Sequence, residues 1–275
     1  MGRTPDPEDI LAQEAVFVLS TGRCGTELLT QLFELAPGTL PLHRPDPELA
    51  YASTLAYGLA RTDGGAEKIG KMFLAGRFDL LLESYIRGRR YIETNNRITF
   101  FAPAIASLMP NARFIHLIRD PEAFVRSSVR REYYSGVPTD LGRIVPEAGA
   151  DAADWPDLSP IGRCAWLWTE TNRFIDDFRR SLDRPGRCMT VRSADLYSDP
   201  AVAAEILQFA GLQIPPPEAI ARLQGRKVNE QLRGPDPGVL ANWSGADQEQ
   251  YRRFVDRYDM SCPGTGRRPT DGGDT

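Results

Sequence analysis

The chain has 275 residues, of which 41% are hydrophobic and 25% are charged, proportions that are ordinary for a soluble globular protein. Its net charge of −4 gives no indication of nucleic-acid binding, and no apolar run reaches the ~18 residues of a transmembrane helix. The four cysteines form no CxxC pair and only two histidines occur, so the sequence predicts neither a disulfide framework nor a metal site.

Composition departs from that of a folded domain at the two ends. Residues 1–13 are rich in acids and prolines and predict a flexible leader, whereas residues 263–275 predict a disordered tail. Residues 14–262 predict one large domain, since the length suits a single α/β unit. The N-terminus has no basic, apolar signal, and scattered thiols suit a reducing compartment, so we expect a cytoplasmic protein.

Strand and helix patterns alternate along this domain. The predicted strands cover residues 15–20, 39–42, 90–94, 112–118 and 187–192. The predicted helices cover residues 26–35, 66–87, 98–108, 121–133, 160–182, 199–211 and 246–258. Such alternation predicts an α/β fold with a mostly parallel central sheet flanked by helices.

The first predicted strand leads directly into a turn with two glycines. Residues 20–27 read Ser-Thr-Gly-Arg-Cys-Gly-Thr-Glu, and a helical pattern of leucines follows. Glycines let the backbone approach a ligand closely, and the first N–H groups of a helix have no partner, so this arrangement is typical of phosphate binding. Arg23 adds a positive charge to the turn. A tight turn without a ligand is the alternative interpretation.

The turn differs from a Walker A motif. Gly22 and Gly25 are separated by two residues instead of four, and Gly25 is followed by Thr26 with no lysine. The pattern therefore does not favour a magnesium triphosphate as the ligand.

A second strand-to-helix junction follows the run 112–118. Arg119 ends the strand, Asp120 suits a helix N-cap, and Pro121 suits the first helical turn. Ser127 lies eight residues after Arg119, about two turns into the helix. An arginine at a strand end and a hydroxyl on the next helix can hold one phosphate from two sides. A surface arginine and an ordinary helical serine are the alternative.

Together the two junctions resemble the sulfotransferase family, which uses 3′-phosphoadenosine-5′-phosphosulfate (PAPS) as sulfuryl donor. The family's first motif, a strand followed by Lys/Arg-x-Gly-Thr, is similar to residues 23–26. Its second motif, a strand ending in Arg-Asp-Pro with a serine eight residues after the arginine, is similar to residues 119–127. The resemblance covers roughly residues 15–260 and implies a P-loop-like three-layer α/β fold of the soluble bacterial type.

The resemblance also implies the residues that bind the donor. The loop for the 5′-phosphosulfate corresponds to Thr21, Gly22, Arg23, Cys24, Gly25, Thr26 and Glu27. Arg23 is expected to stabilise charge on the departing group, and Arg119 and Ser127 are expected to bind the 3′-phosphate. The family needs no metal, so the only implied ligands are PAPS and its product PAP.

The chain departs from the family pattern near its C-terminus. Gly238 and Trp243 are similar to the end of the family's Arg-Lys-Gly loop and its nearby tryptophan, but residues 236–237 read Asp-Pro where Arg-Lys is usual. A replacement contact to the 3′-phosphate is expected from Arg226, Lys227 or Arg233.

The general base is open on sequence alone. The histidine of the family's Lys-Thr-His segment is absent, because the corresponding residues 93–95 read Glu-Thr-Asn. His43 follows the second predicted strand and is the preferred candidate, since an imidazole pKa near 6.5 suits proton transfer at neutral pH. Asp46 and Glu48 lie just beyond it, and Glu93 ends another strand.

Two further segments complete the prediction. Residues 135–159 are rich in Gly, Pro and Asp and predict either an acceptor-side lid or a plain surface excursion. Apolar residues at helical spacing from Ile161 onward predict a core helix, with its Trp and Phe residues in the core instead of forming an adenine platform. His116, inside an apolar strand, is expected to be a core histidine with its hydrogen bonds satisfied.

The predicted function is transfer of a sulfuryl group from PAPS to a hydroxyl or amine of an unidentified small-molecule, carbohydrate or lipid acceptor. A P-loop nucleotide kinase is one alternative, which the absence of a loop lysine disfavours. A non-catalytic nucleotide-binding module on the same fold is the other. The sequence predicts no nucleic-acid partner, no integral membrane segment and no particular oligomeric state.

Overall fold

The computed structural model describes residues 4–225 and 236–260. Its sheet contains five strands in the order β2-β3-β1-β4-β5, and every pair of neighbours is parallel. The strands are β1 Ala15–Leu19, β2 Thr39–Leu42, β3 Arg90–Glu93, β4 Ala112–Ile118 and β5 Cys188–Arg192. The predicted α/β fold with a parallel sheet is confirmed.

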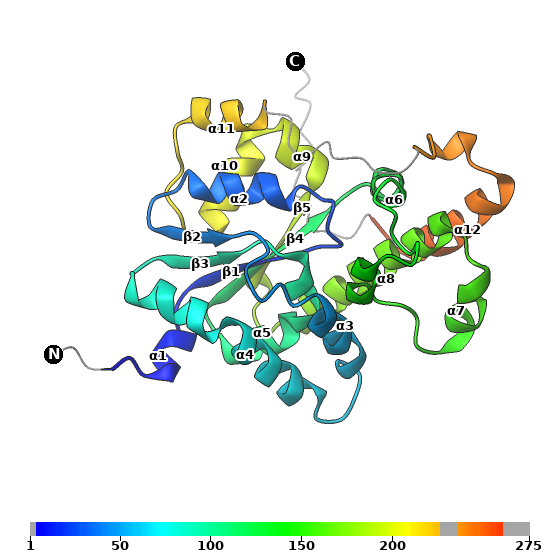
Figure 1. The fold of residues 1–275 in the computed structure, drawn as a ribbon. Helices are drawn as coiled ribbons and strands as arrows, with labels where there is room; N and C mark the ends of the chain where they lie inside the picture. Colours follow the sequence, from blue (N-terminus) through cyan, green and yellow to red (C-terminus); the bar gives the residue numbers. More distant parts are fainter. Residues whose placement is uncertain (1–3, 226–235, 261–275) are drawn as a thin grey trace, which may run out of the picture.

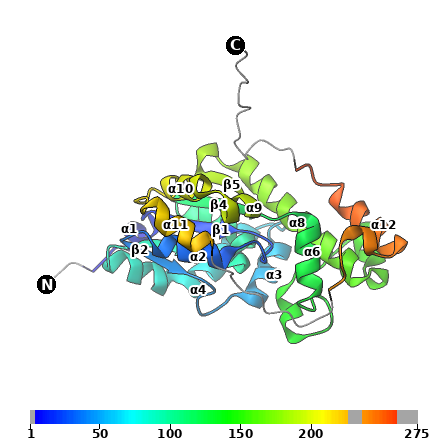
Figure 2. The ribbon, with the colours of Figure 1, turned by 90° about the horizontal axis from the view of Figure 1, so that it is seen from above.

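Helices cover both faces of this sheet (Figures 1 and 2). One face carries α2 Thr26–Glu34, α9 Ser193–Ser198, α10 Pro200–Phe209 and α11 Pro217–Gln224. The opposite face carries α1 Pro7–Leu11, α3 Ala50–Leu59, α4 Gly65–Ile86, α5 Ala102–Leu108 and the 3-10 helix η1 Asn96–Phe101. The three layers are therefore helix, sheet and helix.

A group of helices extends the molecule beyond β4 (Figure 1). The long helix α8 Pro160–Ser181 packs against α6 Pro121–Val129 and α12 Gly245–Val255. The connection from α6 to α8 contains η2 Pro138–Gly142, α7 Gly149–Asp154 and η3 Trp155–Asp157, and the remaining short helices are η4 Pro185–Arg187 and η5 Leu240–Asn242. The segment 135–159 therefore contains three short helices.

The central strand β1 explains why the fold has two cores. Phe17 and Leu19 pack into the core on the α4 and α8 side, whereas Val16 and Val18 pack into the core under α2. All five residues of β1 are at most 1% exposed. A parallel strand covered on both faces must be apolar throughout, which is the run that the sequence shows.

The N-terminal segment differs from its prediction. Residues 7–11, assigned above to a flexible leader, form α1, with Asp6 as N-cap and Pro7 in the first turn. Ile10 is only 2% exposed and joins the core beside α4. Composition alone did not predict α1, because the helix depends on one buried isoleucine that packs against α4. The predicted tail, residues 263–275, lies outside the described residues.

Candidate functional site

The turn between β1 and α2 has a left-handed backbone at three positions. The φ angles are 75° at Gly22, 57° at Arg23 and 96° at Gly25. Gly25 is the N-cap of α2 and offers no side-chain cap, so the first N–H groups of that helix are left for another acceptor. A Cβ on Gly25 would lie 2.9 Å from the ring of Tyr197. Both backbone conformation and space therefore require glycine at position 25.

Hydrogen bonds fix this turn to the surrounding structure. The Ser20 N–H donates to Thr99 Oγ1 (3.0 Å), and the Thr99 hydroxyl donates back to the Ser20 carbonyl (3.1 Å). The Gly22 N–H donates to Ser20 Oγ at 3.1 Å. The Ser193 hydroxyl donates to the Cys24 carbonyl at 2.7 Å. These bonds hold the backbone of the turn in one conformation before any ligand binds.

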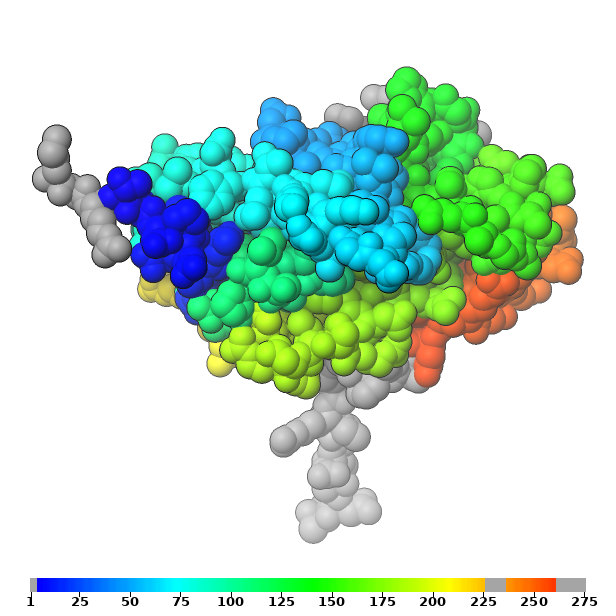
Figure 3. Space-filling model, turned by 90° about the horizontal axis from the view of Figure 1, so that it is seen from below, coloured from blue at the N-terminus to red at the C-terminus, as the bar shows by residue number. Residues whose placement is uncertain are grey.

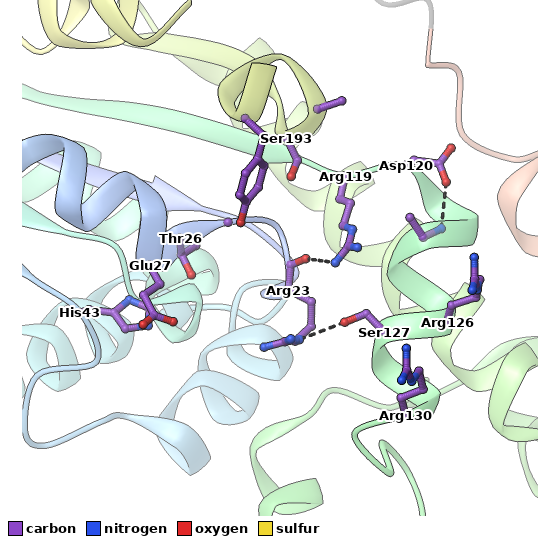
Figure 4. A pocket seen from close by; sticks show the side chains of 14 residues that line it. Arg23, Thr26, Glu27, His43, Arg119, Asp120, Arg126, Ser127, Arg130 and Ser193 are labelled. Atoms are coloured by element: carbon purple, nitrogen blue, oxygen red, sulfur yellow. Dashed lines mark hydrogen bonds between the residues drawn. The ribbon is translucent and has the colours of Figure 1, made fainter. Parts of the chain in front are cut away.

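The second junction meets this turn directly (Figure 4). Arg119 donates from Nη1 to the carbonyl of Arg23 at 2.6 Å, and Arg23 donates from Nε to Ser127 Oγ at 3.2 Å. Asp120 caps α6 by accepting from the Ala123 N–H at 2.8 Å. The structure therefore brings Arg23, Arg119 and Ser127 together, although 104 residues separate Arg23 from Ser127.

A cleft of about 760 Å³ opens between these two junctions. Neither Arg23 nor Arg119 forms an ion pair with any carboxylate of the described residues. Burial lowers the pKa of Arg119, and the neighbouring charge of Arg23 lowers it further. Two like charges held close together destabilise each other, and an anion in the cleft would offset that cost. The cleft is lined by Arg23, Gly25, Thr26, Glu27, His43, Arg119, Asp120, Ala123, Arg126, Ser127, Arg130, Ser193, Ala194 and Tyr197.

Two arginines of this cleft were missed at the sequence level. Arg126 and Arg130 lie one turn apart on the face of α6 that carries Ser127. Both contact Asp236, whose Oδ2 is 3.1 Å from Arg126 Nη2 and 3.4 Å from Arg130 Nη1. The sequence contained a signal for them: the two arginines are four residues apart in the helix that starts at the Asp120 cap, so they lie on one helix face. Asp236 occupies the position where the family pattern has an arginine. It supplies no donor there, and its carboxylate contacts Arg126 and Arg130 instead.

A second, polar cavity of about 390 Å³ adjoins the cleft. The two share Arg23, Thr26 and His43 in their walls. The remaining wall residues are Ser20, Thr21, Gly22, Arg44, Glu48, Ser53, Asn96, Arg97, Phe100, Arg131, Tyr133, Thr139, Gly142, Arg143, Ile144, Leu167 and Thr171. The β1–α2 turn therefore separates two compartments, and His43 borders both.

His43 is oriented by a chain of hydroxyl groups. The Thr30 hydroxyl donates to the Thr26 carbonyl at 2.8 Å, so its oxygen accepts from Thr94 Oγ1 at 2.6 Å. This contact is shorter than the 3.4 Å from Thr94 Oγ1 to the Leu42 carbonyl. Because the hydroxyl proton of Thr94 is donated to Thr30, the Thr94 oxygen accepts from His43 Nδ1 at 3.0 Å. We therefore assign the proton to Nδ1, which leaves Nε2 as the free basic nitrogen.

The protonation state of His43 follows from its surroundings. Desolvation lowers the pKa of His43 below the ordinary 6.5, and the nearby Arg44 lowers it too, against opposing contributions from Glu27 and Glu48. The ring is therefore neutral at pH 7. A neutral, oriented imidazole on the wall of both compartments can accept a proton there.

The candidate carboxylates lie in different environments. Glu48 lines the polar cavity, but its Oε1 is 2.5 Å from Arg44 Nη2. Asp46 is exposed and lines neither compartment. Of these three candidates, His43 is the one that borders both compartments.

Glu93 is not part of the site. Its carboxylate is fully buried and accepts two hydrogen bonds from Arg77 of α4, at 2.8 Å from Nε and 2.9 Å from Nη2. The Tyr91 hydroxyl donates a third at 2.7 Å. The expectation that Glu93 could act as base is corrected, because its acceptor atoms are occupied and it lines neither compartment.

The other predicted residues fall into three groups. Thr21 and Gly22 line the polar cavity, and Glu27 lines the cleft. Cys24 lines neither, and burial raises the pKa of its thiol to about 11, so its contribution is its backbone. The predicted candidates Arg226, Lys227 and Arg233 lie outside the described residues.

Trp168 and His116 lie in the core near the site, as predicted. Trp168 is fully buried, and its Nε1 donates to the Arg119 carbonyl at 2.9 Å. Trp168 is therefore a core residue that also holds the end of β4, in agreement with the prediction that α8 is a core helix. His116 is fully buried and its Nε2 contacts Asn172 Oδ1 at 2.9 Å. Its Nδ1 has no hydrogen-bond partner among the described residues, so the core location is confirmed but the expectation of a fully hydrogen-bonded ring is not.

Over residues 4–225 and 236–260, no cluster of three or more metal-ligating side chains is found. Within the same ranges, no helix combines the length and the apolar character needed to cross a bilayer.

A profile of the sulfotransferase family matches residues 15–216, which include both junctions. This match spans most of the chain, so the protein belongs to the sulfotransferase family. No curated protein sequence matches it significantly.

Several solved structures are similar in fold. The sulfotransferase domain of the olefin synthase of Synechococcus PCC 7002 is 18% identical, with a TM-score of 0.49 over 92% of this chain and 90% of that one. The sulfotransferase domain from the curacin biosynthetic pathway is 15% identical, with a TM-score of 0.49 over 91% and 93%. Sulfotransferase STF1 of Mycobacterium tuberculosis H37Rv is 17% identical, with a TM-score of 0.49 over 91% and 78%.

Proposed function

We propose that the protein transfers a sulfuryl group from PAPS to a hydroxyl or amine of a small-molecule, carbohydrate or lipid acceptor. One observation carries this proposal: Arg119 Nη1 lies 2.6 Å from the carbonyl of Arg23, and Arg23 contacts Ser127. The two family motifs thereby form one cleft, as a ligand with two anionic groups requires.

The cleft has the chemistry to hold PAPS. The uncapped start of α2, the Thr26 hydroxyl and Arg23 would bind the 5′-phosphosulfate, because helix N-termini and guanidinium groups both favour anions. Arg119 and Ser127 would bind the 3′-phosphate, with Arg126 and Arg130 as additional donors. The like charge of Arg23 beside the half-buried Arg119, whose pKa it lowers, supports an anionic occupant.

When bound, PAPS supplies the sulfuryl group: the bond from sulfur to the phosphate oxygen breaks as a bond to the acceptor oxygen forms, and PAP leaves. Arg23 lies between the cleft and the polar cavity, so its guanidinium would stabilise charge on the leaving phosphate. The acceptor would enter from the polar cavity, opposite the donor.

His43 is the proposed general base. Its Nε2 would take the proton of the acceptor hydroxyl, while the Nδ1–H stays on Thr94. The hydroxyl chain through Thr30 stabilises the tautomer that this step needs. General-base catalysis of this kind contributes about 10²–10⁴ in rate.

Thermal unfolding with added nucleotides tests the donor. PAP and PAPS should raise the melting temperature in proportion to the logarithm of their concentration, because a ligand that binds only the folded protein stabilises it. ATP with magnesium should raise it far less. Stabilisation by ATP-magnesium alone would favour a nucleotide kinase.

Transfer of labelled sulfate from PAPS to a panel of hydroxyl and amine acceptors tests catalysis. Binding of PAP without transfer to any acceptor would identify a non-catalytic nucleotide-binding module on this fold.

A further inference from the structure

A large apolar groove runs between α3 and the segment 136–147. Its volume is about 990 Å³. Two α3 residues, Tyr51 and Leu55, line it and are 60% and 42% exposed. Opposite them, Leu141 and Val145 are 70% and 44% exposed. On the face of the molecule in Figure 3, the blue atoms of α3 lie beside the green atoms of this segment.

Exposed apolar side chains collect here more than elsewhere on the described surface. Four of its ten large exposed hydrophobic residues line this one groove. Apolar residues that gather in a concave site, instead of lying singly, indicate a ligand or partner.

The groove adjoins the polar cavity. Arg143 and Ile144 belong to the walls of both. The Arg143 charge is compensated, because the side chain pairs with Asp140 and its guanidinium lies 3.6 Å from the centroid of the Tyr133 ring. The shared wall therefore places no uncompensated charge between the groove and the cavity.

The polar cavity is lined by hydrogen-bonding side chains. Among them are Arg23, His43 and Asn96. A hydroxylated head group in the cavity could hydrogen-bond to this polar wall, and its apolar tail would then extend into the groove.

Resting on the proposed function, we infer that the acceptor is an amphiphile: a hydroxylated head group in the polar cavity and an alkyl or aryl tail in the groove beside α3. The head group faces His43, and the tail contacts Tyr51, Leu55, Leu141 and Val145. Glu147 and Asp140 at the groove disfavour a negatively charged tail end.

A series of 4-alkylphenols, from methyl to octyl, tests this assignment. Their Kd is measured by calorimetry on the PAP-bound protein, and kcat/KM is measured with PAPS. Each added methylene should lower Kd and raise kcat/KM about fourfold, the factor that corresponds to burying one CH₂. If Kd and kcat/KM of the wild-type protein changed by a factor near one for each added methylene, the inference would be overturned.

Leu141→Asp places a charge in the groove at a position too exposed to affect folding. It should reduce the factor per methylene below about twofold, with 4-methylphenol unaffected. Ile86→Asp is the matched control, since Ile86 is 66% exposed on α4 and outside the groove; it should leave the factor at about fourfold. An unchanged factor in Leu141→Asp would overturn the inference.

Two outcomes separate the inference from the proposed function. Chain-length-dependent binding without sulfation of any phenol would leave the groove assignment standing and contradict the sulfuryl transfer. Sedimentation of wild type and Leu141→Asp addresses a protein occupant: a change in oligomeric state would identify a second copy of the chain in the groove and refute the amphiphile.

Discussion

Arg119 shows how one side chain can connect two distant motifs. Its guanidinium holds the carbonyl of Arg23, while its own carbonyl accepts from Trp168. The side chain is thus fixed at both ends and keeps donors available for an anion. Such pre-organisation reduces the entropy that ligand binding would otherwise cost.

We predict that Arg119→Ala weakens PAP binding ten- to hundredfold. Loss of a hydrogen bond to a charged group costs about 1.5–3 kcal/mol. Isothermal calorimetry measures the change, and Arg89→Ala, an exposed arginine outside the cleft, should have no effect. Equal affinity in Arg119→Ala and wild type would exclude Arg119 from the site.

We predict that His43→Gln lowers kcat about 10²–10⁴-fold and leaves PAP binding unchanged. In wild type, kcat should be constant near neutral pH and fall as the pH drops through the lowered pKa of His43, below 6.5, because only the neutral ring accepts a proton. Rate measurements from pH 5 to 8 check both points. Near-normal turnover of His43→Gln would transfer the role to a carboxylate such as Glu48.

At the scale of elements, α6 organises the anion-binding side of the cleft. The Asp120 cap and Pro121 fix where the helix begins, and this start sets the direction of Ser127, Arg126 and Arg130. Asp236 contacts both arginines, so a carboxylate lies where a phosphate is proposed to bind. The two anions would compete for the same guanidinium groups.

We predict that Asp236→Asn tightens PAP binding about two- to fivefold. Partly exposed ion pairs have modest energies, so the gain is small. The gain should shrink at high salt, which screens the competing charge. Asp157→Asn, an exposed aspartate outside the cleft, is the control. Weaker binding in Asp236→Asn would show that Asp236 supports the site instead of competing with it.

At the scale of the whole molecule, the two compartments lie at the carboxyl edge of the sheet. β1 is flanked by β3 on one side and β4 on the other, and parallel sheets bind ligands where the chain connections diverge in this way. The buried pair of Arg77 and Glu93 joins α4 to the end of β3. This pair stabilises the frame on which His43 and Thr94 are held.

We predict that Glu93→Gln lowers the free energy of unfolding by about 3–5 kcal/mol, because it leaves the buried Arg77 without its counter-charge. The kcat of the protein that remains folded should stay within a factor of two. Urea denaturation and active-site titration with PAP measure the two quantities.

Glu83→Gln is the matched control, since it breaks an exposed pair with Arg87 and should cost less than about 1 kcal/mol. A hundredfold loss of kcat in folded Glu93→Gln would return Glu93 to the list of catalytic candidates.

The sequence by itself determined the sheet, its parallel strands and the two junctions. Continuous apolar strands, glycines at required left-handed positions and the Asp120–Pro121 helix start are local features, and local features can be read from short windows of sequence. Helix α3 was missed, because its apolar residues Tyr51 and Leu55 face outward and do not follow the pattern of a buried face.

Only the tertiary structure decided which candidate groups meet. Glu93 ends β3 and His43 follows β2 at the same edge of the sheet, yet Glu93 is held by Arg77 and His43 lies on the wall of both compartments. The pairing of Arg126 and Arg130 with Asp236 and the groove beside α3 likewise depend on contacts between distant segments. Their physical reason is the same: burial and charge compensation belong to neighbours in space, which the order of residues along the chain does not specify.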